Sequence, residues 1–201
     1  GRLIGWKHPD ASIRLAESLK EKGYSFKMTL IGTGEMEEQL HNMIRDKSLE
    51  DCVEMPGAMK ASEVRSYMEK ADIYLFTSDF NEGWGAVLNE SMNSGCAVVA
   101  SHAIGSVPFL IKDEENGLIY ENGNQKQLEQ QVCRLMDDAE HRMKLGLNAY
   151  HTIADLWNAD VAAERLIDLC ENIIFAKKTK SPYENGICSE AKVMENDWFS
   201  K

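Results

Sequence analysis

Residues 72–100, DIYLFTSDFNEGWGAVLNESMNSGCAVVA, contain two short apolar runs separated by a polar loop and a segment with helical spacing. The runs Asp72–Phe76 and Ala97–Ala100 have the length and composition of buried strands. Gly85–Ser94 has the spacing of a helix and is followed by Gly95, a residue that commonly ends helices. A strand, a helix and a second strand in this order predict two parallel strands joined by a right-handed crossover.

The same alternation continues on both sides of this segment. Further strands are expected in Gly1–Ile4, Tyr24–Ile31, Cys52–Met55 and Leu118–Tyr120. Further helices are expected in Glu35–Lys47, Ala61–Lys70, Gln125–Met136, Ala139–Tyr150 and Ala159–Ile174. This order predicts an α/β fold with a doubly wound, Rossmann-like parallel sheet and extra C-terminal helices. We assign residues 1–175 to one domain and residues 176–201 to a C-terminal tail.

Composition and charge narrow the class of protein. Of the 201 residues, 43% are hydrophobic, which is the balance of a globular domain with a core. The 22 basic and 33 acidic residues give a net charge of −11, so general binding to nucleic acid is not expected. The longest apolar run, Cys96–Ala100, is too short to cross a membrane, so no transmembrane segment is expected.

Five scattered cysteines predict reduced thiols in a cytoplasmic protein. The chain opens without Met or a secretory signal, so we expect a preceding part to be missing.

Ligands of doubly wound folds bind outside the carboxyl ends of the strands, so the loops at those ends are candidate sites. The first loop carries Arg2 and Lys7, a suitable pair for a diphosphate, although two exposed surface cations are the alternative. The second holds Gly32 and Gly34, whose backbone can approach an anion at the start of a helix. An ordinary tight turn is the alternative there, because Glu37 replaces the third glycine of a dinucleotide fingerprint.

The loop after the strongest predicted strand combines carboxylates with glycine. Glu82 and Glu90 would lie roughly 10 Å apart along the start of the helix, given its rise per residue. The amides of Trp84, Gly85 and Ala86 lie between them, where a helix N-terminus favours phosphate. Two acidic residues with this separation also occur by chance in so acidic a chain. The sequence Gly83-Trp84-Gly85 between a strand and a helix, however, is hard to explain by packing alone. The histidines and cysteines have neither nucleophile–base nor metal-ligand spacing, so no metal is expected.

Glu82 and Glu90 match the paired-glutamate motif of the retaining GT-B glycosyltransferases of family 4, the group 1 type, which this chain resembles. Other pieces follow in the order of that family: Gly1-Arg2-Leu3 with Lys7, Gly32-Thr33-Gly34-Glu35, Pro56-Gly57, Ala71–Leu75, Gly95–Ser101, Gly105–Pro108 and Asn116–Leu118. The resemblance covers residues 1–174 and implies the C-terminal, donor-binding lobe of a GT-B fold. The N-terminal lobe, which supplies most acceptor contacts, would be absent from this chain.

The resemblance also implies a role for each matching residue. Arg2 and Lys7 would contact the diphosphate and stabilise the departing nucleoside diphosphate. Glu82 would contact the donor sugar near its reacting carbon, and Glu90 would accept the ribose hydroxyls. The other implied substrate-binding positions are Gly32, Gly34, Gly57, Gly83, Trp84, Gly85, Ala86 and Val87. Trp84 stands where the family often has Phe, so we expect a narrower sugar site.

The implied activity is the transfer of a sugar, with retention, from a nucleotide-diphosphate sugar to an acceptor hydroxyl in polysaccharide or glycolipid biosynthesis. The partners would be the nucleotide sugar and an acceptor sugar or glycolipid, with no cofactor and no metal. The full-length enzyme would be cytoplasmic and peripheral at the inner membrane. A sugar-nucleotide epimerase lobe and a non-catalytic sugar-nucleotide-binding module remain alternatives.

The tail carries three aromatic residues, Tyr183, Trp198 and Phe199. In the family that the chain resembles, the C-terminal segment crosses back to the other lobe. Without that lobe we expect either disorder beyond about Lys177 or packing on a neighbouring copy, which would make the tail a dimer contact.

Overall fold

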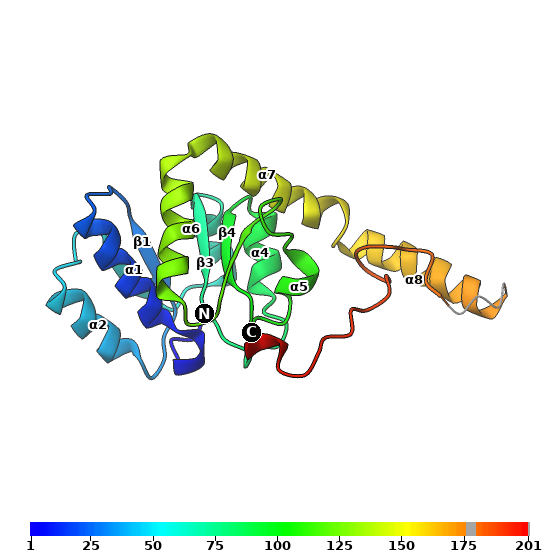
Figure 1. Ribbon diagram of the computed structural model, residues 1–201, viewed down its shortest axis with the longest axis horizontal. Coiled ribbons are helices and arrows are strands. Elements are labelled where there is room, and N and C mark those ends of the chain that lie inside the picture. The colour runs from blue at the N-terminus through cyan, green and yellow to red at the C-terminus, as the bar shows by residue number, and fades with distance from the viewer. Residues whose placement is uncertain (176–179, 201) are drawn as a thin grey trace.

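The computed structural model describes residues 1–175 and 180–200 of the chain. Strands lie at the centre of the molecule, helices surround them, and the last long helix projects away from the body (Figure 1). The strands are β1 (Met28–Ile31), β2 (Val53–Gly57), β3 (Ile73–Phe76), β4 (Ala97–Ser101) and β5 (Leu118–Tyr120). The helices are α1 (Pro9–Glu21), α2 (Glu37–Asp46), α3 (Ala61–Met68), α4 (Val87–Asn93), α5 (Val107–Leu110), α6 (Gln125–Asp137), α7 (Ala139–Asp155) and α8 (Ala159–Ile174), with short 3-10 helices η1 (Gly5–Lys7) and η2 (Trp198–Ser200).

Hydrogen bonding divides the strands into two parallel sheets. β1 pairs with β2, and a second sheet has the order β3-β4-β5. In the second sheet Ile73 lies opposite Ala97, and Val99 lies opposite Leu118. Each parallel pair is joined through a helical connection, which confirms the α/β fold expected from the sequence.

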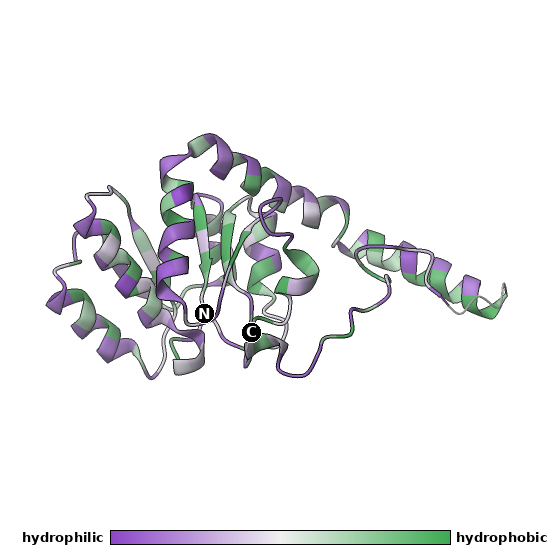
Figure 2. Ribbon diagram, viewed as in Figure 1, coloured by the Kyte–Doolittle hydropathy of each residue, from purple (hydrophilic) through white to green (hydrophobic). Residues whose placement is uncertain are grey.

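The core is built around β4, in which all five residues are buried. One apolar cluster joins β4 to α1, α6 and β5 through residues such as Leu15 and Leu128, and a second joins it to α4 through Leu88 and Met92. Figure 2 shows β3 and β4 as largely hydrophobic strands between mixed helices. A continuous apolar run is typical of a strand that is covered on both faces, which is why its position could be predicted.

The opening segment differs from the sequence expectation. Gly1–Ile4 is extended but is not a strand. The Gly1 amino group donates to the Ile31 carbonyl at the end of β1 (2.6 Å), and the Leu3 amide donates to the Thr33 carbonyl just beyond that strand (2.9 Å). The Leu3 carbonyl accepts instead from the Met36 amide, just before α2 (3.0 Å). The segment is therefore held at the carboxyl end of β1 without the regular ladder of a strand.

The tail folds back onto its own lobe. Its first half lies beside α8, where the Arg165 guanidinium donates to the Asn185 carbonyl (2.5 Å). At its other end Phe199 stacks on Phe80, with ring centroids 4.5 Å apart. Residues 180–200 thus have contacts on their own lobe, which the sequence analysis did not expect, whereas disorder in solution and packing on a neighbouring copy stay predictions.

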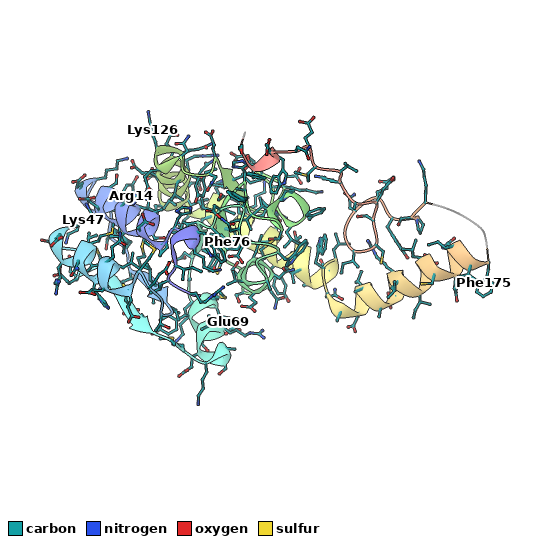
Figure 3. The ribbon with its side chains drawn as sticks, turned by 90° about the horizontal axis from the view of Figure 1, so that it is seen from below. Arg14, Lys47, Glu69, Phe76, Lys126 and Phe175 are labelled. Atoms are coloured by element: carbon teal, nitrogen blue, oxygen red, sulfur yellow. The ribbon has the colours of Figure 1, made fainter. Side chains whose placement is uncertain are left out.

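Helix α8 extends beyond the body of the molecule, and Phe175 lies at its far end (Figure 3). None of its residues is fully buried. Residues 176–179, which the expectation of disorder also included, lie outside the described residues. In the part of the chain that is described, no helix is both long and apolar enough to cross a membrane.

Candidate functional site

Two loops that are far apart in the sequence meet at the carboxyl ends of the strands. The first contains η1, and the second follows β3. The Thr77 hydroxyl of the second loop donates to the Lys7 carbonyl (2.7 Å), and the Asp79 amide donates to the Trp6 carbonyl (2.9 Å). These bonds bring the predicted cation loop alongside the predicted carboxylate loop.

Lys7 and Glu82 form an ion pair between the two loops. The Ser78 hydroxyl donates to the same carboxylate oxygen, Oε2, at 3.0 Å. The Lys7 and Glu82 side chains are 21% and 13% exposed, so water screens their attraction only in part. The other oxygen, Oε1, accepts no hydrogen bond from any described residue. The pair therefore offers a cation for phosphate and a carboxylate oxygen for a ligand hydroxyl.

The turn after Glu82 presents unused backbone donors. The amides of residues 83–86 donate to no acceptor in the described ranges. Gly85 has φ +71°, and a Cβ there would lie 2.5 Å from the Phe76 ring, which occupies the middle of the body (Figure 3). This non-helical backbone delays the start of α4 to Val87, two residues later than predicted. The helix has seven residues, so the anion-attracting end expected from the sequence belongs to a shorter helix than we predicted.

Arg2 and Glu90, the other charged residues predicted for the site, are both exposed. The Arg2 guanidinium is 6.0 Å from the centre of the Trp6 ring, and no described carboxylate is within ion-pair distance of it. Burial lowers the pKa of the Gly1 amino group, the Lys7 ammonium lowers it further, and the Glu90 carboxylate raises it. The charges of Lys7 and Glu90 therefore both act on the Gly1 amino group.

The glycines predicted to bind substrate lie beside the opening loop. A Cβ on Gly32 would lie 1.6 Å from the Gly1 carbonyl oxygen, so the two segments meet backbone to backbone. Gly34 makes the same close approach to Leu3. The Gly32 amide donates to the Gly57 carbonyl at the end of β2 (2.9 Å). Their direct contact with a ligand stays a prediction.

The Trp84 side chain belongs to an aromatic cluster. Its ring centroid is 5.8 Å from those of Phe109 and Trp157, and its indole N–H donates to Asn89 (2.9 Å). These partners come from α5, the α7–α8 connection and α4. Narrowing of a sugar site by Trp84 stays a prediction.

Sequence reasoning missed the residues that hold the ion pair in place. Ser78 contacts Glu82, Thr77 contacts the Lys7 backbone, and the Asp79 carboxylate faces His8 across the two loops. Contacts between segments about 70 positions apart leave no periodic pattern in a sequence. The sequence offered one signal for these contacts, the serine that lies four residues before Glu82.

The described residues contain no candidate metal centre. Across residues 1–175 and 180–200, no three His, Cys, Asp or Glu side chains gather in a way that could hold a metal ion. The five cysteines are free thiols.

Comparison with known proteins assigns the chain to a family. The sequence model of the family described as "Glycosyl transferases group 1" matches residues 1–152. The chain belongs to this family. This chain is 30% identical over 177 residues to the amylovoran biosynthesis glycosyltransferase AmsK of Erwinia amylovora. The aligned region covers 86% of this chain and 43% of AmsK. The chain is also 26% identical over 168 residues to the poly(ribitol-phosphate) alpha-N-acetylglucosaminyltransferase of Staphylococcus aureus, which covers 84% of this chain and 34% of that enzyme.

Solved structures agree with this assignment. The group 1 chain is similar to the C-terminal domain of the glycosyl transferase LpcC from Francisella tularensis, with a TM-score of 0.72 and 26% identity, over 79% of this chain and 83% of that domain. It is also similar to a variant of S. aureus TarM in complex with Fondaparinux, alpha-GlcNAc-glycerol and UDP, with a TM-score of 0.75 and 25% identity, over 84% of this chain and 34% of TarM. The group 1 chain thus spans less than half the length of the curated relatives named above, and the family and fold expected from its motifs are confirmed.

Proposed function

We propose that this chain is the donor-binding part of a glycosyltransferase that takes a sugar from a nucleoside-diphosphate sugar, with retention, in polysaccharide biosynthesis. One observation carries the proposal: Lys7 and Glu82 form an ion pair where the loop of η1 meets the loop after β3, next to amides that have no partner in the described chain. Two relatives are named for amylovoran biosynthesis and for transfer of alpha-N-acetylglucosamine to poly(ribitol phosphate), which supports a polysaccharide product.

The diphosphate is assigned to the two cations. Arg2 has no described carboxylate partner, and the Lys7 ammonium is held by the Glu82 carboxylate, which a diphosphate would displace. Negative charge develops on the nucleoside diphosphate as the bond to the sugar breaks. Fixed cations at that point stabilise the departing group more than they stabilise the bound donor.

The sugar and the ribose are assigned to the carboxylates. Glu82 keeps Oε1 for a sugar hydroxyl while Ser78 holds Oε2, and the amides of residues 83–86 offer further donors. Glu90 is exposed near Gly1 and accepts the paired ribose hydroxyls in this arrangement. The acceptor hydroxyl must then be held against the anomeric carbon while the diphosphate leaves, a task that we assign to protein outside this chain.

The proposal is tested by thermal denaturation of the chain with UDP or GDP, each with and without chelator. A bound nucleotide at 100 times its dissociation constant stabilises the folded state by about 2.7 kcal/mol. We expect the melting temperature to rise equally in both conditions. Loss of the shift on adding chelator would contradict metal-independent binding, and no shift with either nucleotide would contradict donor binding.

Glu90→Ala tests the assignment of the ribose in the same assay. Ribose hydroxyls left without an acceptor should weaken nucleoside diphosphate binding by about 1–3 kcal/mol. Glu69→Ala, which removes an exposed glutamate of a helix-surface ion pair next to α3, is the matched control and should bind as the wild type does. Unchanged affinity of Glu90→Ala would remove Glu90 from the site.

A further inference from the structure

We propose that Asp79 is a positioning residue for donor binding, which acts through His8 to hold the cation loop against the carboxylate loop. The inference rests on the proposed function, because it concerns the placement of Lys7 and Glu82 relative to a diphosphate. Neither Asp79 nor His8 belongs to the motifs that indicated the site. Both residues lie in the contact between the two loops.

The two oxygens of the Asp79 carboxylate have different partners. Oδ1 accepts from the backbone amide and the side-chain amide of Asn81, at 2.8 and 2.9 Å. The Asp79 carbonyl accepts from the Glu82 amide (3.0 Å), so this turn leads directly into Glu82. Oδ2 faces the other loop, 3.3 Å from Nε2 of His8. One side chain, 14% exposed, thus shapes the turn before Glu82 and contacts the residue after Lys7.

His8, whose side chain contacts Asp79, has a left-handed backbone conformation. Its φ of 46° and ψ of 49° lie in the left-handed region, where a residue other than glycine is uncommon. This conformation ends η1, and α1 begins at the next residue. A strained backbone at such a point is retained when surrounding contacts over-determine it. The contact with Asp79 is one of those constraints.

Two side-chain contacts therefore lie next to each other between the two loops. Lys7 and His8 are adjacent in one loop, and their side chains contact Glu82 and Asp79, which are three residues apart in the other. The Asp79 amide adds a bond to the Trp6 carbonyl (2.9 Å). Removing the His8–Asp79 contact leaves two side-chain links between these loops, the Lys7–Glu82 ion pair and the hydrogen bond from the Thr77 hydroxyl to the Lys7 carbonyl. When a diphosphate then displaces Glu82 from Lys7, the position of the Lys7 ammonium is less well fixed. A small misplacement of a binding group weakens binding considerably.

The test separates positioning from folding by comparing two ligands. For the nucleoside diphosphate that binds the chain, UDP or GDP, its affinity and that of the corresponding monophosphate are measured by calorimetry. His8→Gly removes the imidazole, and glycine adopts the left-handed backbone without strain, so folding is preserved. Asp79→Ala removes the carboxylate from the other side. His151→Ala is the control, because it breaks an exposed His–Asp contact on α7.

We expect His8→Gly and Asp79→Ala to weaken diphosphate binding about 5- to 10-fold while monophosphate affinity changes less than about 2-fold. A purely structural role would lower both affinities together, or only the melting temperature, and either result would overturn the inference. So would unchanged binding of both ligands in both variants. Wild-type protein that binds neither nucleotide would instead refute the proposed function, and the inference with it.

Discussion

At the scale of single residues, the Lys7–Glu82 pair has a consequence for ligand affinity. In the ligand-free chain the Lys7 ammonium already has a carboxylate partner, so a diphosphate must compete with Glu82 for it. Glu82→Gln removes that competitor and keeps a side chain of the same size. We predict that UDP or GDP then binds about 2- to 5-fold more tightly, as expected for a partly exposed ion pair. Isothermal titration measures this, and weaker binding by Glu82→Gln would show that Glu82 supports the nucleotide directly.

At the scale of elements, the loop between β3 and α4 depends on one glycine. Gly85 has a positive φ and lies against Phe76, so a Cβ there must displace the ring or the loop. We predict that Gly85→Ala destabilises the fold by about 1–3 kcal/mol. Gly83→Ala is the matched control, since nothing lies within 4 Å of the position of its Cβ. Thermal denaturation of the two variants distinguishes them, and equal melting temperatures would contradict the strained turn.

The same elements show what the sequence can and cannot predict. β3, β4 and β5 were predicted within one residue, because continuous apolar runs mark buried parallel strands. The start of α4 was placed two residues early, because the helical spacing of the residues after Gly85 hides the non-helical backbone of Gly85 itself. The candidate site was predicted as separate loops. Its assembly through Ser78, Thr77 and Asp79 depends on tertiary contacts that no local pattern encodes.

At the scale of the whole molecule, the proposed function gives this chain the donor contacts and assigns the acceptor contacts to protein outside it. Correct positioning of two reactants is worth about 7–11 kcal/mol of barrier. We therefore predict that the 201-residue chain binds nucleoside diphosphate but transfers no sugar at ordinary rates. The assay incubates the chain with nucleotide sugars and glycoside acceptors, and it measures the release of nucleoside diphosphate and the mass of any product. Transfer at about 1 per second or faster would show that this chain suffices.

The central claim is that Lys7 binds the diphosphate of a sugar nucleotide at its meeting point with Glu82. The affinity of Lys7→Ala for UDP or GDP, titrated in the presence of chelator beside the wild type, tests it most directly. A hydrogen bond to a charged phosphate is worth about 1.5–3 kcal/mol, so we predict at least about 10-fold weaker binding by a variant that still unfolds cooperatively. Wild-type affinity in Lys7→Ala would contradict the claim.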